Sequence, residues 1–98
     1  DTTTNTGRIT YLDGRLVIQS DDDDELGSST IEFQVDGSEV VRMAASGNVG
    51  IGTDSPDTLM HLSSLTDATL RLESTKTTVA TNDVIGAIEW EGNDATTG

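Results

Sequence analysis

The centre of the chain reads Ser46-Gly47-Asn48-Val49-Gly50-Ile51-Gly52-Thr53-Asp54-Ser55-Pro56, which holds three of the ten glycines and the only proline. Val49 and Ile51 alternate with Gly50 and Gly52, so a strand here carries β-branched side chains on one face and no side chain on the other. Glycine weakens a strand and usually marks a place where another backbone approaches closely. Turn-forming residues flank the strand on both sides. The stretch therefore predicts a short strand against which another chain or a neighbouring hairpin packs.

A first hairpin is predicted near the start of the chain. Residues 8–12 and 15–19 are rich in strand-forming residues and flank Asp13-Gly14, which is a strong signal for a two-residue hairpin turn. Such a turn brings the apolar side chains of both strands onto one face, in the pairs Tyr11–Leu16 and Ile9–Ile18.

A second hairpin is predicted around Asp36-Gly37-Ser38. Residues 30–35 alternate strictly between polar and apolar side chains, as expected for a half-buried strand. A three-residue turn pairs the apolar residues of the two strands, Phe33 with Val41 and Ile31 with Met43, whereas a two-residue turn would place Ile31 opposite Arg42. Because a slip of one residue moves a strand's side chains to the other face, the pattern favours the three-residue turn.

Further strands are predicted over 58–62, 68–73 and 84–91.

Two short sequence motifs from the first half of the chain recur in the second half. Leu16-Val17-Ile18-Gln19-Ser20 recurs as Leu70-Arg71-Leu72-Glu73-Ser74. Ile31-Glu32-Phe33 recurs as Ile88-Glu89-Trp90, with Ile9-Thr10-Tyr11 as a looser copy. Self-similarity of this kind is typical of stacked, elongated architectures.

The repeat predicts three parts. Residues 1–7 are a linker or an entering extended segment, and residues 8–62 form a first β-repeat unit with a glycine-rich junction at 46–56. Residues 63–98 begin a second, similar unit. The chain opens on Asp1 rather than Met, and we expect it to be a fragment of a longer protein.

Composition limits the possible partners. The chain has 98 residues with 18 acidic and 5 basic side chains, a formal net charge of −13, which argues against binding to nucleic acid or to anionic membrane surfaces. Only 33% of residues are hydrophobic and 3% aromatic, so a single chain has little material for a core and burial between identical chains is the natural remedy. Low hydrophobicity with high charge also raises intrinsic disorder, against which the regular strand patterns argue. There is no cysteine, and no signal peptide or membrane span is visible.

No catalytic, cofactor-binding or metal-binding residues are predicted. His61 is the only histidine, no nucleophile elbow accompanies it, and we interpret it as a packing residue. The acidic run from Asp21 to Glu25 is interpreted as a solvated loop; a calcium loop would want glycine where Leu26 stands. Trp90 could stack on a glycan, but its repeat position favours an anchor in a core.

The central stretch also carries a resemblance. The run Glu39–Pro56, followed by Leu59-Met60-His61-Leu62, resembles a repeat of tailed-bacteriophage tail-fibre proteins, of the form "ER(M)RI-x-SxGNVGIGTxSPxxxLHV". Residues 70–94 are similar to the "TLRLES … IGxIEWxGND" stretch that often follows it. Val40-Val41 and Met60-His61-Leu62 depart slightly from the family's usual residues. The motif marks a structural repeat and not an activity.

The resemblance implies an all-β, elongated fibre segment of short strands and hairpins, intertwined as a homotrimer around a three-fold axis. Its function would be that of a shaft segment in the tail fibre of the virion, outside the cell, holding a distal receptor-binding tip. Its partners would be itself, other tail or virion proteins and, indirectly, the host surface. We expect interchain packing at Val49, Gly50, Ile51, Gly52, Ile31, Phe33, Ile88 and Trp90.

Two alternatives remain open. The segment could itself bind a host-surface glycan or protein, or it could be a capsule depolymerase carried on a fibre. The lack of clustered aromatic residues and of a catalytic arrangement in the sequence argues against both.

Overall fold

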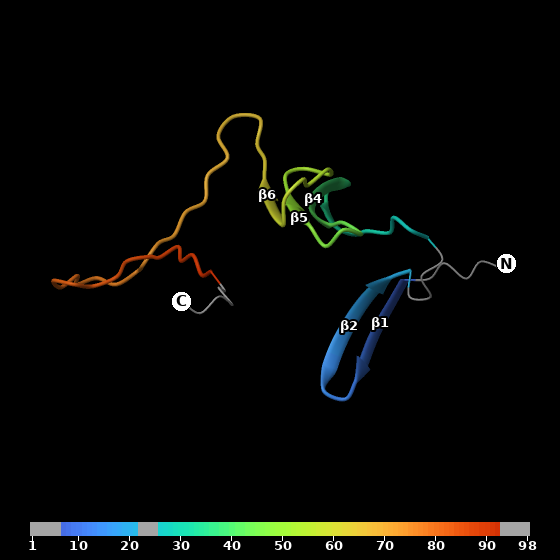
Figure 1. Ribbon diagram of the computed structural model, residues 1–98, viewed down its shortest axis with the longest axis horizontal. Coiled ribbons are helices and arrows are strands. Elements are labelled where there is room, and N and C mark those ends of the chain that lie inside the picture. The colour runs from blue at the N-terminus through green and yellow to red at the C-terminus, as the bar shows by residue number, and fades with distance from the viewer. Residues whose placement is uncertain (1–6, 22–25, 93–98) are drawn as a thin grey trace, which may run out of the picture. The chain divides into compact units, whose positions relative to one another are not determined.

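The computed structural model describes residues 7–21 and 26–92, and all the regular structure in these ranges is β (Figure 1). Six short strands form two sheets, a two-stranded sheet with the order β1-β2 and a four-stranded sheet with the order β3-β4-β5-β6. The strands are β1 (Gly7–Leu12), β2 (Arg15–Ser20), β3 (Ile31–Val35), β4 (Ser38–Met43), β5 (Val49–Ile51) and β6 (Met60–Leu62). The predicted all-β class is confirmed. No helix able to cross a membrane occurs in the described ranges.

The β1–β2 hairpin has the predicted register. Tyr11 pairs with Leu16 and Ile9 pairs with Ile18 in an antiparallel ladder. Asp13 and Gly14 have φ angles of 54° and 76°. Positive φ at both central positions is typical of a type I′ turn, whose twist matches that of the two strands. The hairpin leaves its apolar face bare, since Tyr11 is 75% exposed. A lone two-stranded ribbon of this kind is marginally stable and needs a partner surface.

The β3–β4 hairpin has the predicted pairs but a different turn. Phe33 pairs with Val41, while the next residue, Gln34, pairs with Glu39, so Val40 has no opposite residue and forms a bulge. The predicted three-residue turn is wrong, because only Asp36 and Gly37 lie between the strands, with φ angles of 50° and 77°. The additional residue that keeps the apolar side chains on one face lies in β4 and not in the turn.

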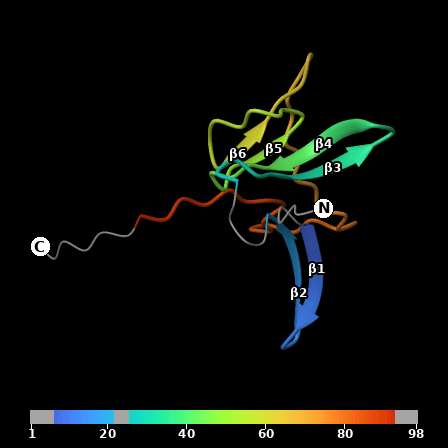
Figure 2. The ribbon, with the colours of Figure 1, turned by 90° about the vertical axis from the view of Figure 1, so that its right-hand side faces the viewer.

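The glycine-rich stretch contributes β5, which lies in the interior of the four-stranded sheet (Figure 2). It pairs antiparallel with β4 and parallel with β6. Parallel strands usually need a crossover of about a dozen residues or more, whereas here residues 52–59 make the connection. Asn48 Nδ2 donates to the Pro56 carbonyl at 3.1 Å and holds this connection in place. We call residues 52–59 the crossover loop.

Residues 69–92, which we call the arm, belong to a second compact unit, Thr69–Gly98. The strands predicted at 68–73 and 84–91 are wrong for the single chain, because the structure assigns no strand to either range. The arm still contains an ordered turn: Asp83 pairs with Lys76, accepts from the Ala80 amide at 2.7 Å, and donates its own amide to the Ala80 carbonyl at 3.1 Å. Gly86 lies against Leu72, since a Cβ placed there would be 3.1 Å from the Leu72 Cβ.

Candidate assembly surface

The four-stranded sheet has one apolar and one polar face. Residues directly opposite each other in the ladder lie on the same face, so the register sorts the side chains. One face, which we call the apolar face, carries Ile31, Phe33, Val35, Val41, Met43, Val49, Ile51, Met60 and Leu62. The other face, which we call the polar face, carries Glu32, Gln34, Glu39, Arg42, Gly50 and His61. Ser38, opposite Val35 at the turn, is the one polar side chain beside the apolar set.

The crossover loop lies on the polar face at Gly50. Gly50 is the one buried residue among those described. A Cβ placed at Gly50 would lie 2.6 Å from the Thr53 carbonyl oxygen and 3.3 Å from the Pro56 Cβ. Gly52 has a φ of 81°, and a Cβ there would clash with the Ser63 carbonyl. The close approach predicted for these glycines therefore comes from the chain's own backbone.

Arg42 ties the sheet to the crossover loop. Its guanidinium donates to Glu39 Oε1 at 2.6 and 2.8 Å, to Glu32 Oε1 at 2.7 Å, and to the Asp54 carbonyl at 3.1 Å. The hydrogen bond from Gln34 lowers the pKa of the Glu32 carboxyl, and the nearby Arg42 charge adds to the effect. The hydrogen bond to Glu39 raises the pKa of Arg42. The three charged side chains thus form a satisfied network on a partly covered face.

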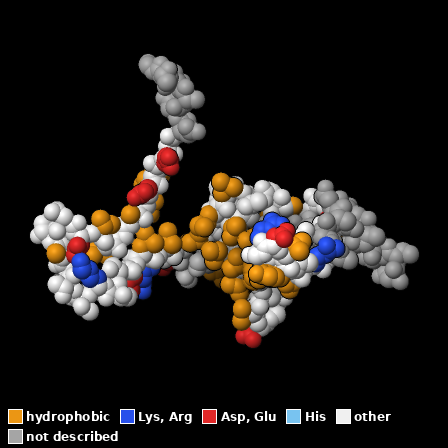
Figure 3. Space-filling view, turned by 90° about the horizontal axis from the view of Figure 1, so that it is seen from below, with side chains coloured by type: hydrophobic (Ala, Val, Ile, Leu, Met, Phe, Trp, Pro, Cys, Tyr) orange, Lys and Arg blue, Asp and Glu red, His pale blue; other side chains and the backbone are white. Residues whose placement is uncertain are grey.

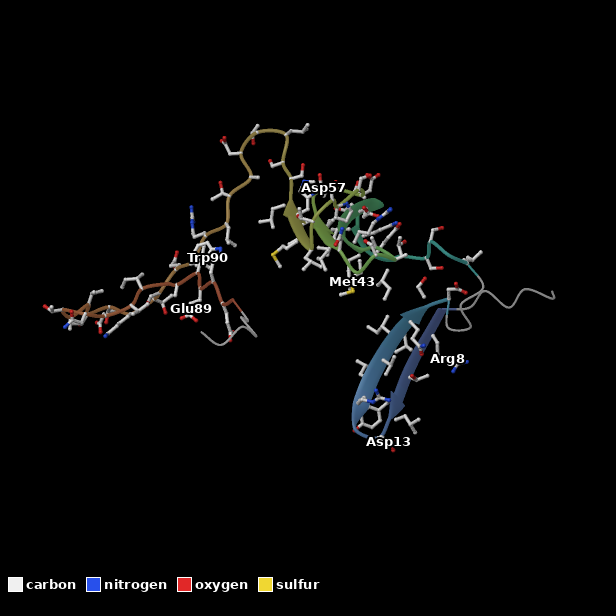
Figure 4. All side chains as sticks on the ribbon, viewed as in Figure 1. Arg8, Asp13, Met43, Asp57, Glu89 and Trp90 are labelled. Atoms are coloured by element: carbon white, nitrogen blue, oxygen red, sulfur yellow. The ribbon has the colours of Figure 1, made fainter. Side chains whose placement is uncertain are left out.

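The side chains of the apolar face are half-buried or exposed. Phe33 is 49% exposed, Met43 45% and Met60 63%, and no hydrophobic side chain in the described ranges is buried. Hydrophobic side chains form patches on the face seen in Figure 3, and Figure 4 shows the Met43 side chain beside the sheet. The crossover loop buries Gly50 on the polar face, whereas every described side chain of the apolar face is half-buried or exposed.

The structure brings together four of the eight residues predicted to pack between chains. Ile31, Phe33, Val49 and Ile51 share the apolar face, where Val41, Met43, Met60 and Leu62 extend the set. The prediction missed Met60 and Leu62 as site residues because the parallel pairing of β5 with β6 has no local sequence signal.

The other four predicted residues lie elsewhere. Gly50 and Gly52 contact the chain's own loops, as described above. Ile88 and Trp90 lie in the arm, 60% and 88% exposed. Interchain packing of all eight residues stays a prediction.

The described residues contain no cluster of three or more side chains suited to a metal ion. Residues 22–25 of the acidic run lie outside the described ranges. Asp21 has a φ of 57°, and its carboxylate accepts from the Leu26 amide at 2.7 Å and from Ser29 Oγ at 3.2 Å. His61 is half-buried on the polar face, where its Nδ1 accepts from the Asp57 amide at 3.4 Å.

The described residues define a chain of short β-strands, and the largest sheet has one face of half-buried and exposed hydrophobic side chains. Comparison of the chain with protein-family models, with curated proteins and with solved structures finds no match.

Proposed function

We propose that the chain is a structural segment of a multichain β-fibre, in which three copies close their apolar faces on one another. The exposed hydrophobic side chains on one face of the four-stranded sheet carry this proposal. A sheet face as apolar as this one must be buried against another layer, and the described residues of its own unit, Asp1–Ala68, supply none. The same face on two sister chains is a cover of matching size and chemistry.

The amount of exposed surface supports association. The described ranges contain no buried hydrophobic side chain, and on the four-stranded sheet Phe33 is 49% exposed, Ile51 39% and Met60 63%. Burial of apolar surface stabilises by about 25 cal/mol per Å², which gives association a large driving force against the repulsion between acidic chains.

The distribution of charge fits the same arrangement. All the charged side chains of the four-stranded sheet, Glu32, Glu39 and Arg42, lie on the face opposite to the proposed contact. Chains joined through the apolar face therefore keep these charges out of the interface, where an unpaired charge would be costly. The net charge of −13 then faces solvent and keeps assembled fibres apart.

The resemblance of residues 39–62 and 70–94 to tail-fibre repeats supports a more specific role. In this proposal the segment is part of the shaft of a bacteriophage tail fibre on the virion, and it holds a receptor-binding tip at a distance from the particle. Its partners are two copies of itself, neighbouring tail proteins and, through the tip, the host surface.

Two adjacent residues of β3 provide a matched test. Phe33 lies on the apolar face and Gln34 on the polar face, so Phe33→Lys and Gln34→Lys add the same charge to opposite sides of one strand. We expect Phe33→Lys to reduce the sedimenting mass to that of one chain and Gln34→Lys to leave the oligomer intact. The added positive charge lowers the net repulsion in both variants, so repulsion cannot explain a loss. A Phe33→Lys protein of unchanged oligomeric mass would contradict the proposal.

Binding of a host-surface glycan is the second candidate function, favoured by the exposure of one aromatic ring. Trp90 on the arm is 88% exposed (Figure 4), and an exposed indole ring can stack on a sugar. A glycan array with the native chain and with Trp90→Ala tests this candidate. A polysaccharide-degradation assay on the same samples tests for a depolymerase.

A further inference from the structure

We propose that residues 69–73 of one copy add as a strand to the open edge of β3 in a second copy. In this pairing Leu70 and Leu72 extend the apolar face, and Arg71 extends the polar face beside Glu32. The inference rests on the self-association proposed above, and it names the segments through which two chains join.

The acceptor is the outer edge of β3. In the sheet order β3-β4-β5-β6, β3 has a neighbour on one side only, and no other described strand lies along its outer edge. The edge runs over five residues, Ile31–Val35. An uncovered edge presents free backbone donors and acceptors and is a ready template for a strand from another chain.

The donor is an extended segment of the arm that lacks a ladder in its own chain. Residues 69–73 match the five residues of the acceptor edge in length and alternate between apolar and polar side chains. Leu70 is 62% exposed and Leu72 48% exposed. The motif that begins at Leu70 resembles the motif that begins at Leu16, and the motif at Leu16 lies in strand β2. The donor sequence is therefore suited to a strand and needs only a partner.

Charge favours this donor over the other candidate in the arm. Because side chains alternate along a strand, any register that places both leucines on the apolar face places Thr69, Arg71 and Glu73 on the polar face. The donor thus brings a cation at its centre and no net charge, whereas the other candidate brings only a carboxylate. That face carries two carboxylates, Glu32 and Glu39, against the single cation Arg42. Pairing through residues 88–90 with the apolar residues aligned would instead set Glu89 beside Glu32, and like charges across strands are unfavourable.

The rest of the arm supplies a second strand to the same sheet. The Lys76–Asp83 pair closes the turn between the two halves of the arm, and Gly86 lies against Leu72. Docking of residues 69–73 therefore brings the segment around Gly86 next to the new strand. The two strands that the sequence predicts in the arm would then form when chains associate.

The acceptor belongs to a second copy because the chain leaves its own sheet at the opposite edge. Strand β6, which precedes the arm, is the edge strand farthest from β3. Residues 63–68 connect β6 to the arm, and Leu65 within them is fully exposed.

The absence of cysteine from the sequence makes disulfide trapping a direct test. Chains carrying Gln34→Cys are refolded together with size-tagged chains carrying either Thr69→Cys, which an antiparallel pairing brings opposite, or Glu73→Cys, which a parallel pairing brings opposite. We expect a disulfide between tagged and untagged chains in one of the two mixtures, in clear excess over a Leu65→Cys control. Arg71→Glu should lower that yield several-fold, and Arg71→Lys should preserve it.

Other results would overturn the inference in distinguishable ways. A further sample is a single chain that carries Gln34→Cys together with Thr69→Cys or Glu73→Cys. If disulfides form within that chain but not between the mixed chains, the donor pairs with the sheet of its own chain and the second copy is excluded. No disulfide in any mixture, with oligomeric mass retained, would reject the arm as donor and leave the proposed fibre function standing. No disulfide together with a monomeric mass would reject both.

Discussion

Gly50 and Thr53 lie so close together that a Cβ at position 50 would come within 2.6 Å of the Thr53 carbonyl oxygen. The glycine strand β5 is thus the surface on which its own crossover loop rests. That loop buries the backbone of Gly50 and receives a hydrogen bond from Arg42 at the Asp54 carbonyl. The crossover loop, residues 52–59, thus lies on the polar side of the sheet at Gly50, while the side chains of the apolar side are half-buried or exposed.

Replacing Gly50 should therefore destabilise the fold. Gly50→Ala forces the crossover loop away from the sheet, and overpacking of this kind typically costs about 1–3 kcal/mol. Gly27→Ala is the matched control, because a Cβ at Gly27 meets no atom within 4 Å. Thermal unfolding should show a lower midpoint for Gly50→Ala alone. Equal midpoints for the two variants would argue that the loop does not lie on β5.

Acidification should weaken the sheet through Glu32. The hydrogen bond from Gln34, with help from Arg42, lowers the pKa of this carboxyl in the fold. A lowered folded-state pKa means that the stabilising contribution is present above the ordinary pKa of glutamate and is lost as pH falls through the lowered value. The unfolding midpoint should fall less steeply in acid for Glu32→Gln than for the native chain. The pKa of Asp83 is also lowered, by Lys76 and by the Ala80 amide, so protonation of Asp83 destabilises both proteins in acid to the same extent. Parallel acid profiles would contradict the role given to Glu32.

The two-residue turn of the second hairpin makes Gly37 sensitive to substitution. Its φ of 77° is disfavoured for residues with a Cβ, so Gly37→Ala should destabilise by about 1–2 kcal/mol. Asp36 has a φ of 50°, and Asp36→Asn should be nearly neutral because asparagine tolerates this region. Denaturant titration of both variants checks the turn. A tolerated Gly37→Ala would favour the three-residue turn that the side-chain pattern predicts.

Removal of divalent cations should leave the protein unchanged. Asp21 uses its carboxylate for hydrogen bonds to Leu26 and Ser29, and the run from Asp21 to Glu25 lacks the ligand spacing of a calcium loop. Unfolding with and without a chelator should give the same midpoint. A drop of several degrees on chelation would instead assign a structural calcium to the acidic run.

Local signals predicted the hairpins well. Asp-Gly turns and alternating side chains gave the register of β1–β2 and the pairs of β3–β4. The turn of the second hairpin was predicted wrongly because a bulge at Val40 and a longer turn place the apolar residues identically, and a side-chain pattern cannot distinguish them. The position of the additional residue depends on backbone bonding, since the Val40 carbonyl accepts from the Gly52 amide at 3.0 Å.

The remaining differences have non-local causes. Alternate glycines predicted a close approach at β5, but the residue types do not say whether another chain or the next loop makes it. The parallel contact of β5 with β6 depends on how the crossover loop returns, which no pattern within β6 encodes. In the arm, the alternating residues around Leu72 and Ile88 predicted strands that are absent from the single chain, because a strand requires a ladder partner as well as a suitable sequence.

The most direct test of the account is the sedimenting mass of the chain, measured together with its unfolding midpoint over a range of protein concentrations. If sister chains cover the apolar face, the native chain sediments at three times its 10.3 kDa mass, and the midpoint rises with concentration because folding and association are coupled. A folded species of one-chain mass at micromolar concentration, with a midpoint independent of concentration, would contradict the account.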